Sequence, residues 1–243
     1  MRKMQSIERY RRQIPIIREE GQKKIKETKI LIAGVGGLGS ITSILLAETG
    51  IGELILIDHG TVKMSNLNRQ LLYTPNDIGK EKSRIAEKRL KEINPETKIT
   101  AINQTIKEDN IAEHIKKADI VIDGMDNYEA RYILNKVCVQ ENKPFIHGAV
   151  HGTVGQIMTI VPHKGPCLQC LIPKKPPTIK EIPILTTTPT VIGSLQTTEA
   201  IKLITKMGDP LIGRLLVYDG LEMKFHEIRV AKKIECKICG KPT

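Results

Sequence analysis

The sequence predicts an α/β fold with a doubly wound, mostly parallel sheet and a C-terminal antiparallel extension. Over residues 29–150, short apolar runs alternate with amphipathic helical patterns, which is typical of parallel strands joined by helices. Over residues 151–243, several segments alternate apolar and polar side chains instead. That alternation is typical of antiparallel strands with one face in solvent.

The first strand is expected over about Lys29–Ala33, at the start of the stretch KILIAGVGGLGS, because this apolar run suits a buried strand. Gly34, Gly36 and Gly39 have the G-x-G-x-x-G spacing of a Rossmann-like turn from a strand into a helix. The helix behind this turn should run to about Thr49. Its N-terminus favours negative charge, so the turn can hold a phosphate. NAD and ATP can both use such a turn, and the motif alone leaves the nucleotide open.

Four further strands and three helices follow in alternation. The second strand, ELILID, ends at Asp58, and the dipeptide NP stops the helix after it. The expected strands are residues 53–58, 98–103, 119–123 and 144–149, and the expected helices are residues 80–93, 110–118 and 128–141.

The C-terminal part combines antiparallel strands with one helix. GQIMTIV, RLLVYDG and KFHEIRV are the expected strands. A Pro- and Lys-rich segment, residues 172–183, precedes a helix over about residues 189–206, with Thr188 as its expected N-cap and Pro189 in its first turn. We therefore expect one domain in three parts: an N-terminal helical segment (1–28), a nucleotide-binding half (29–150) and an antiparallel half (151–243).

Composition favours a cytoplasmic enzyme. The 243 residues are 40% hydrophobic, with no run of roughly 18 apolar residues that would cross a membrane, and the basic N-terminal stretch lacks the apolar core of a signal peptide. The net charge of +11 could attract a nucleic acid, but 3% aromatic residues and no Trp leave few surfaces for base stacking. We therefore expect neither a membrane nor a nucleic-acid partner, while an acidic protein or a nucleotide stays possible.

The residues after the glycine turn favour a triphosphate over a dinucleotide. Asp58 lies 19 residues after Gly39, where an acidic residue binds the ribose of either nucleotide. The loop MSNLNRQLL beyond it contains Arg69, and Lys82 follows. An Arg and a Lys directed at one pocket neutralise a triphosphate before an anionic nucleophile approaches it. Asp126, after the fourth strand, offers a hard oxygen ligand for Mg²⁺.

Four of the five cysteines form two C-x-x-C pairs, Cys167 with Cys170 and Cys236 with Cys239. In a cytosolic chain this pattern indicates one tetrahedral Zn²⁺ site with four thiolates. With no open coordination position, the zinc would be structural and would hold the C-terminal tail. A redox dithiol or two disulfides are the alternatives.

Several motifs together resemble those of the MoeB/ThiF/HesA family, whose members are related to the adenylation domains of ubiquitin-activating enzymes. The resemblance runs from about Glu8 to Gly240. SNLNRQ combined with the other motifs is more specific than the glycine turn. The matching motifs are RYRRQ (9–13), GVGGLGS (34–40), SNLNRQ (65–70), DGMDN (123–127), the two C-x-x-C pairs and GSLQTTEAIK (193–202).

The resemblance implies that the glycine turn belongs to an ATP site. Gly37 would approach the nucleotide through its backbone, and Asp58 would bind the ribose hydroxyls. Asn66, Arg69 and Lys82 would hold the phosphates. The residues implied for nucleotide binding are Gly37, Asp58, Ser65, Asn66, Arg69, Gln70, Lys82, Asp126 and Asn127.

Four matching positions would carry the chemistry: Arg12, Arg69, Lys82 and Asp126. Asp126 would hold Mg²⁺, with Asn127 beside the nucleotide. Arg12 would reach across the interface of a homodimer into the ATP site of the partner, like an arginine finger supplied in trans.

Structural roles stay open for some of these residues. Asp58 could cap its strand, Arg69 could belong to a structural ion pair, and Arg12 could lie on the surface. One departure from the family pattern follows the second strand, where members often have Asp-x-Asp and this chain has Asp58-His59-Gly60.

The function implied by the resemblance is an ATP-dependent adenylation. The substrate would be the C-terminal glycine carboxylate of a ubiquitin-like sulfur-carrier protein with a Gly-Gly tail, similar to MoaD or ThiS, and pyrophosphate would be released. The carrier would serve molybdopterin synthesis, thiamine synthesis or tRNA thiolation. The alternatives are an NAD-dependent oxidoreductase, a non-catalytic adapter and an ATP-dependent tRNA-modifying relative.

A covalent step on this chain is not expected. Some family members have a catalytic cysteine just before the helix that corresponds to residues 189–206, but here that place reads ILTTTPT. Cys138 shares a helix face with Leu134 and is expected in the core. His147 and His151 are not expected to bind a metal, since they lie on a strand and loop and need not share a face.

Overall fold

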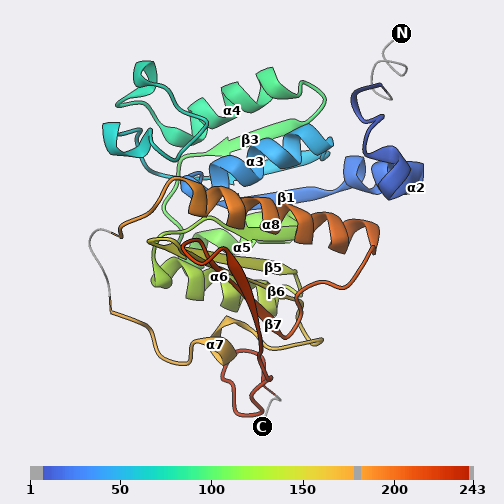
Figure 1. Cartoon of the computed structure of the whole chain (residues 1–243), viewed down its shortest axis with the longest axis vertical. Coiled ribbons are helices and arrows are strands. Elements are labelled where there is room, and N and C mark those ends of the chain that lie inside the picture. The colour runs from blue at the N-terminus through green and yellow to red at the C-terminus, as the bar shows by residue number, and fades with distance from the viewer. Residues whose placement is uncertain (1–7, 178–181, 241–243) are drawn as a thin grey trace.

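The computed structural model describes residues 8–177 and 182–240, which contain an eight-stranded sheet (Figure 1). The strand order is β3-β2-β1-β4-β5-β6-β7-β8, parallel from β3 to β5 and antiparallel from β5 to β8. The predicted fold class is confirmed. The strands are β1 (Lys29–Ala33), β2 (Glu53–Ile57), β3 (Lys98–Ile102), β4 (Ile120–Asp123), β5 (Phe145–His151), β6 (Val154–Ile160), β7 (Arg214–Asp219) and β8 (Lys224–Arg229).

Helices cover both faces of the parallel part, as Figure 1 shows. Each face has its own core, because the side chains of β1 alternate between the two faces. Ile30 and Ile32 belong to the first core, and Leu31 and Ala33 belong to the second. The first face carries α3 (Gly37–Thr49), α4 (Lys82–Ile93) and α8 (Thr187–Thr205), with α2 (Ile14–Glu27) packed against α8, and the second carries α5 (Glu108–Lys117) and α6 (Tyr128–Gln140), with the short α7 (Leu168–Leu171) beside α6.

The glycines between β1 and α3 are required by close backbone contacts. Gly34 has a φ of +87°, and a Cβ there would lie 2.7 Å from the carbonyl oxygen of Gly124, after β4. A Cβ on Gly39 would lie 1.9 Å from the carbonyl oxygen of Gly34. The turn therefore brings the ends of β1 and β4 and the start of α3 into direct contact.

The start of α8 differs from the prediction. Thr186 occupies the N-cap position, and Thr188 lies in the first turn, where its hydroxyl donates a hydrogen bond to the carbonyl of Gly152 (3.1 Å). Predicting Thr188 as the N-cap was therefore wrong. The physical reason is a bridge between Gly152 and Ile184, which fixes the chain just before the helix and lets it begin earlier. Residues 178–181 of the predicted Pro- and Lys-rich segment lie outside the described residues.

Among the described residues, no helix combines the length and the apolar character that a membrane span requires.

Candidate active site

A cavity of about 670 Å³ lies at the carboxyl ends of the parallel strands. Ligands of open α/β sheets bind at this edge, because the loops that follow neighbouring strands meet there. Nine of the ten predicted nucleotide-site and catalytic residues line the cavity: Gly37, Asp58, Ser65, Asn66, Arg69, Gln70, Lys82, Asp126 and Asn127. The tenth, Arg12, does not.

Asp58 joins the glycine turn to the end of β2. Its carboxylate accepts hydrogen bonds from the backbone N–H of Val35 (2.9 Å) and of Gly60 (2.7 Å). Asp58 therefore does cap the end of its strand, the structural role considered for it from the sequence. It does not exclude ribose binding, since each carboxylate oxygen can accept a further hydrogen bond.

The SNLNRQ loop is held by its own backbone and side chains. Asn66 is buried, and its side-chain oxygen accepts a hydrogen bond from the N–H of Lys63 (3.0 Å). Arg69 donates from Nη1 to the carbonyl of Ser65 and to the side chain of Asn68, both at 2.9 Å. No carboxylate of the described residues pairs with Arg69, so the structural ion pair considered for it does not form there. Its positive charge faces the cavity without a counterion from this part of the chain.

Lys82 begins α4 and is half-buried in the same cavity. Burial lowers the pKa of its amino group, while the carboxylates of Asp58 and Asp126 oppose this shift. Tyr73 lies behind the glycine turn and donates from its hydroxyl to the carbonyl of Val35 (2.8 Å). Burial raises the pKa of Tyr73, so its hydroxyl stays protonated as a donor. Arg69 therefore stands on the SNLNRQ loop and Lys82 on the first turn of α4, and both line the same cavity.

Asp126 and Asn127 lie on the loop between β4 and α6. Asn127 caps α6 by accepting the N–H of Ala130 (2.9 Å), and its amide nitrogen donates to Asp126 (3.2 Å). Asp126 is exposed and lines the cavity. A single carboxylate beside a phosphate-binding pocket fits Mg²⁺, which usually takes one or two protein carboxylates and completes its shell with phosphates and water.

A buried charged cluster beneath this loop was not predicted from the sequence. Asp123, at the end of β4, contacts Nε of Arg131 (3.0 Å) and Nδ1 of His147 (2.8 Å). Burial alone would raise the pKa of Asp123, but Arg131, His147 and a backbone N–H lower it below its ordinary value. Burial lowers the pKa of His147, so its ring is neutral. The position of Asp123 at a strand end was the one sequence signal for this cluster.

Arg12 lies far from the cavity of its own chain. It is exposed, and its neighbour Gln13 donates to the carbonyl of Thr49 (2.8 Å), at the end of α3. The start of α3, at Gly37, lines the cavity. The rise along α3 separates its two ends by about 18 Å. The structure therefore brings the other nine residues together and leaves Arg12 near the opposite edge of the sheet.

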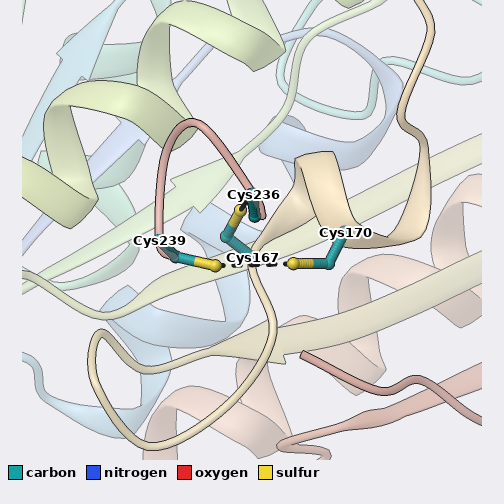
Figure 2. Close-up of side chains that lie close together, drawn as sticks. All are labelled: Cys167, Cys170, Cys236 and Cys239. Atoms are coloured by element: carbon teal, nitrogen blue, oxygen red, sulfur yellow. Dashed lines mark hydrogen bonds between the residues drawn. The ribbon is translucent and has the colours of Figure 1, made fainter. Parts of the chain in front are cut away.

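The four paired cysteines converge from α7 and the C-terminal tail (Figure 2). Their sulfur atoms all lie within 4.8 Å of one another, with 3.6 Å between Cys167 and Cys236 and 3.4 Å between Cys170 and Cys239. All four thiols are free. Four sulfur ligands at about 2.3 Å from a tetrahedral zinc lie about 3.8 Å apart, so this cluster could hold Zn²⁺.

Comparison with known proteins identifies the family. The model of the ThiF family matches residues 10–238. The chain belongs to the ThiF family. It is 35% identical to a sulfur carrier protein adenylyltransferase of Thermus thermophilus, over 97% of this chain and 92% of that protein, and 35% identical to the SAMP-activating enzyme E1 of Haloferax volcanii, over 96% and 89%. A crystal structure of E. coli MccB with ATP is similar, with a TM-score of 0.81 and 29% identity over 96% of this chain and 73% of that chain.

This ThiF-family chain is an adenylyltransferase, and family membership supports ATP as its nucleotide. Two features of the structure bear on whether it also forms a covalent intermediate. Cys138 is completely buried in α6, as expected, and burial raises the pKa of its thiol, which disfavours a nucleophilic thiolate. The segment before α8 contains no cysteine, and Leu185 there donates its backbone N–H to Gly152 (3.0 Å).

Proposed function

We propose that this chain activates the C-terminal carboxylate of a ubiquitin-like sulfur-carrier protein by forming an acyl-adenylate from ATP. The observation that carries the proposal is the cavity itself, which Arg69, Lys82 and Asp126 line together. Among the described residues, neither Arg69 nor Lys82 forms an ion pair with a carboxylate. Two cations without an ion-pair partner, next to a carboxylate, suit a triphosphate with its Mg²⁺. We infer the carrier protein from the names of the related proteins, a sulfur carrier protein adenylyltransferase and a SAMP-activating enzyme.

The proposed reaction is a displacement at the α-phosphorus of ATP. An oxygen of the carrier carboxylate forms a new bond to the α-phosphorus. The bond from the α-phosphorus to the oxygen that bridges it to the β-phosphorus breaks, and pyrophosphate leaves with the electron pair. No proton moves, so the chain needs no general base. Arg69 and Lys82 would neutralise the phosphates while Asp58 orients the ribose. Mg²⁺, held through Asp126, would offset the remaining phosphate charge.

The working unit is proposed to be a homodimer in which each chain acts as a single adenylation domain. Arg12 is exposed and lies near the far end of α3 from the cavity of its own chain. A role in catalysis therefore requires a second copy that presents this arginine to the cavity. Such a contact would add a third positive charge to the phosphates only in the assembled dimer.

The carrier is proposed to dock on the hairpin between β7 and β8. All six residues of β8 are exposed, and the hairpin carries the exposed apolar side chains of Leu221 and Met223. Because β5 ends at the cavity and the next two strands are antiparallel, this hairpin lies at the same edge of the sheet as the cavity. A small protein bound there could extend a flexible C-terminal tail toward the ATP site.

The four cysteines are proposed to bind a structural Zn²⁺. Four thiolates fill a tetrahedral shell and leave no position for a substrate. Cys167 is the N-cap of α7 and Cys170 lies within that helix, whereas Cys236 and Cys239 lie in the tail, so the metal would attach the tail to the body of the domain.

The experiment that tests the proposed function is ATP–pyrophosphate exchange with a panel of candidate carriers from the same cell. We expect exchange only with a carrier that ends in Gly-Gly, because the reaction starts from its terminal carboxylate. A carrier shortened by its last two residues is the matched control and should give none. Exchange that is equal with the intact and the shortened carrier, or absent with every carrier in the panel, would contradict the proposal.

A further inference from the structure

The residue that precedes Asp126 is fixed through both of its backbone polar groups. The N–H of Met125 donates to Oδ1 of Asp123 (3.0 Å), and its carbonyl accepts from Nη2 of Arg131 (2.5 Å). On the other side of Asp126, Asn127 is fixed by its capping hydrogen bond to α6. Asp126 itself is exposed, and among the described residues its side chain forms a hydrogen bond only with Asn127. Its direction is therefore set by its two neighbours.

Asp123 and Arg131 form a rigid support under this loop. The two side chains are 0% and 6% exposed, and Nε of Arg131 lies 3.0 Å from Oδ2 of Asp123. His147 donates to the same carboxylate, and its second ring nitrogen receives a hydrogen bond from Gln156 (3.1 Å). Arg131 also donates to the carbonyl of Gly148 (3.2 Å). Strands β4, β5 and β6 and helix α6 therefore hold the pair.

A buried ion pair of this kind contributes little to stability by itself, since removing two charges from water offsets their attraction. Apolar side chains of similar volume would fill the same space. Apolar side chains could not form hydrogen bonds with both the N–H and the carbonyl of Met125. The planar fork of arginine can pair with a carboxylate through Nε and bind a carbonyl through Nη2, which the single ammonium of lysine does not reproduce.

We propose that Arg131, together with Asp123, is a positioning residue for the adenylation reaction: it fixes the backbone of Met125 and thereby directs the carboxylate of Asp126 toward the phosphates and their Mg²⁺. This inference rests on the proposed function, in which Asp126 holds the metal. Arg131 acts through Met125 and does not itself need to touch the nucleotide.

The test compares Arg131→Lys and Arg131→Gln with the wild-type protein. Two quantities are measured: the Mg²⁺ concentration for half-maximal ATP–pyrophosphate exchange, and the hydrogen-exchange rate of the backbone amides of residues 124–127 without nucleotide. We expect both variants to need about tenfold more Mg²⁺, the scale for losing a residue that orients a metal ligand. Their loop amides should also exchange faster, while the melting temperature falls only slightly in the lysine variant.

The control is Glu199→Gln, which disturbs another buried carboxylate at the opposite edge of the sheet. Glu199 accepts hydrogen bonds from Thr159 (2.5 Å) and from the N–H of Leu211 (2.7 Å) and pairs with Lys202 (2.5 Å). This variant should lose stability without changing the Mg²⁺ dependence or the loop exchange. An Asp126→Asn variant reports on the proposed function: if it too leaves the Mg²⁺ dependence unchanged, the metal role of Asp126 is wrong.

Two results would overturn the inference. The first is a shifted Mg²⁺ dependence in Asp126→Asn combined with unchanged Mg²⁺ dependence and loop exchange in both Arg131 variants. The second is faster loop exchange in both Arg131 variants with an unchanged Mg²⁺ dependence, because the loop would then loosen without changing how Asp126 holds the metal.

Discussion

The contacts of Arg69 favour a role in nucleotide binding over a purely structural one. It donates only to a backbone carbonyl and to an asparagine of its own loop among the described residues, and it lines the cavity. We predict that Arg69→Ala lowers carrier-dependent ATP–pyrophosphate exchange by at least about 100-fold, because a charge contact to the transition state is lost. Asp126→Ala should have an effect of similar size.

The matched control is Arg84→Ala. Arg84 lies on α4, is exposed, pairs with Glu81 and Glu87, and does not line the cavity. The Arg84→Ala variant should catalyse ATP–pyrophosphate exchange at the wild-type rate. A folded Arg69→Ala or Asp126→Ala protein with near-normal exchange would remove that residue from the proposed mechanism.

At the residue scale, the sequence predicted those positions that a local pattern marks. Asp58 follows an apolar strand, and the SNLNRQ loop carries its polar residues in one short stretch. Asp123 and Arg131 were not predicted, because their role depends on hydrogen bonds between β4, α6 and β5. The direction of a buried side chain is a product of packing and has no signature in a local pattern.

At the scale of elements, the zinc site joins α7 to the C-terminal tail. We predict about one Zn²⁺ per purified chain, bound by Cys167, Cys170, Cys236 and Cys239. Cys236→Ser or a chelator should remove the metal and lower the melting temperature, because the tail loses its attachment, while the exchange rate per folded molecule changes little.

Cys138→Ala provides the comparison for the zinc prediction. Cys138 is buried in α6 and is absent from the cysteine cluster, so this variant should keep its zinc. Freshly prepared protein without zinc and with disulfides between the paired cysteines would refute the metal site.

The hairpin between β7 and β8 gives a second prediction at this scale. Leu221 is 77% exposed and does not line the cavity. Leu221→Asp should weaken carrier binding about tenfold or more, the cost of a charged side chain at the centre of a protein interface, and leave ATP binding unchanged. Ile78→Asp, an exposed apolar residue after η2 (Pro75–Asp77), is the control and should bind the carrier normally. If both variants bound the carrier with equal affinity, the hairpin would not be the docking surface.

The sequence located the long elements well and their ends less well. The helix behind the glycine turn ends at Thr49 as expected, since Gly50 terminates it with a left-handed backbone. The start of α8 was misplaced by two residues, because the bridge from Gly152 to Ile184 decides where that helix begins. The four-residue α7 was missed, since so short an element carries no periodic pattern.

At the scale of the whole molecule, alternation of strands and helices predicted a parallel sheet, and the change of pattern after residue 150 predicted the antiparallel strands. The order of the strands did not follow from the pattern. It depends on contacts such as the approach of Gly34 to Gly124, which joins β1 to β4 across ninety residues of sequence.

The proposed dimer makes a prediction about mixed subunits. Arg12→Ala and Lys82→Ala should each be weak alone. In a mixed dimer, one site combines the intact Arg12 of one chain with the intact Lys82 of the other, so activity should return to as much as about half that of the wild-type dimer. If subunits demonstrably mix and no activity returns, the arginine does not act across the interface.

The proposed reaction transfers the adenylyl group of ATP to the C-terminus of a carrier protein. The most direct measurement uses ATP labelled at the α-phosphate together with the carrier and follows the label by mass spectrometry of the intact carrier. We predict that the label appears on the C-terminal carboxylate of the carrier, with one pyrophosphate released per labelled carrier. A carrier that stays unlabelled while the ATP is hydrolysed, or a chain that binds NAD in place of ATP, would contradict this proposal.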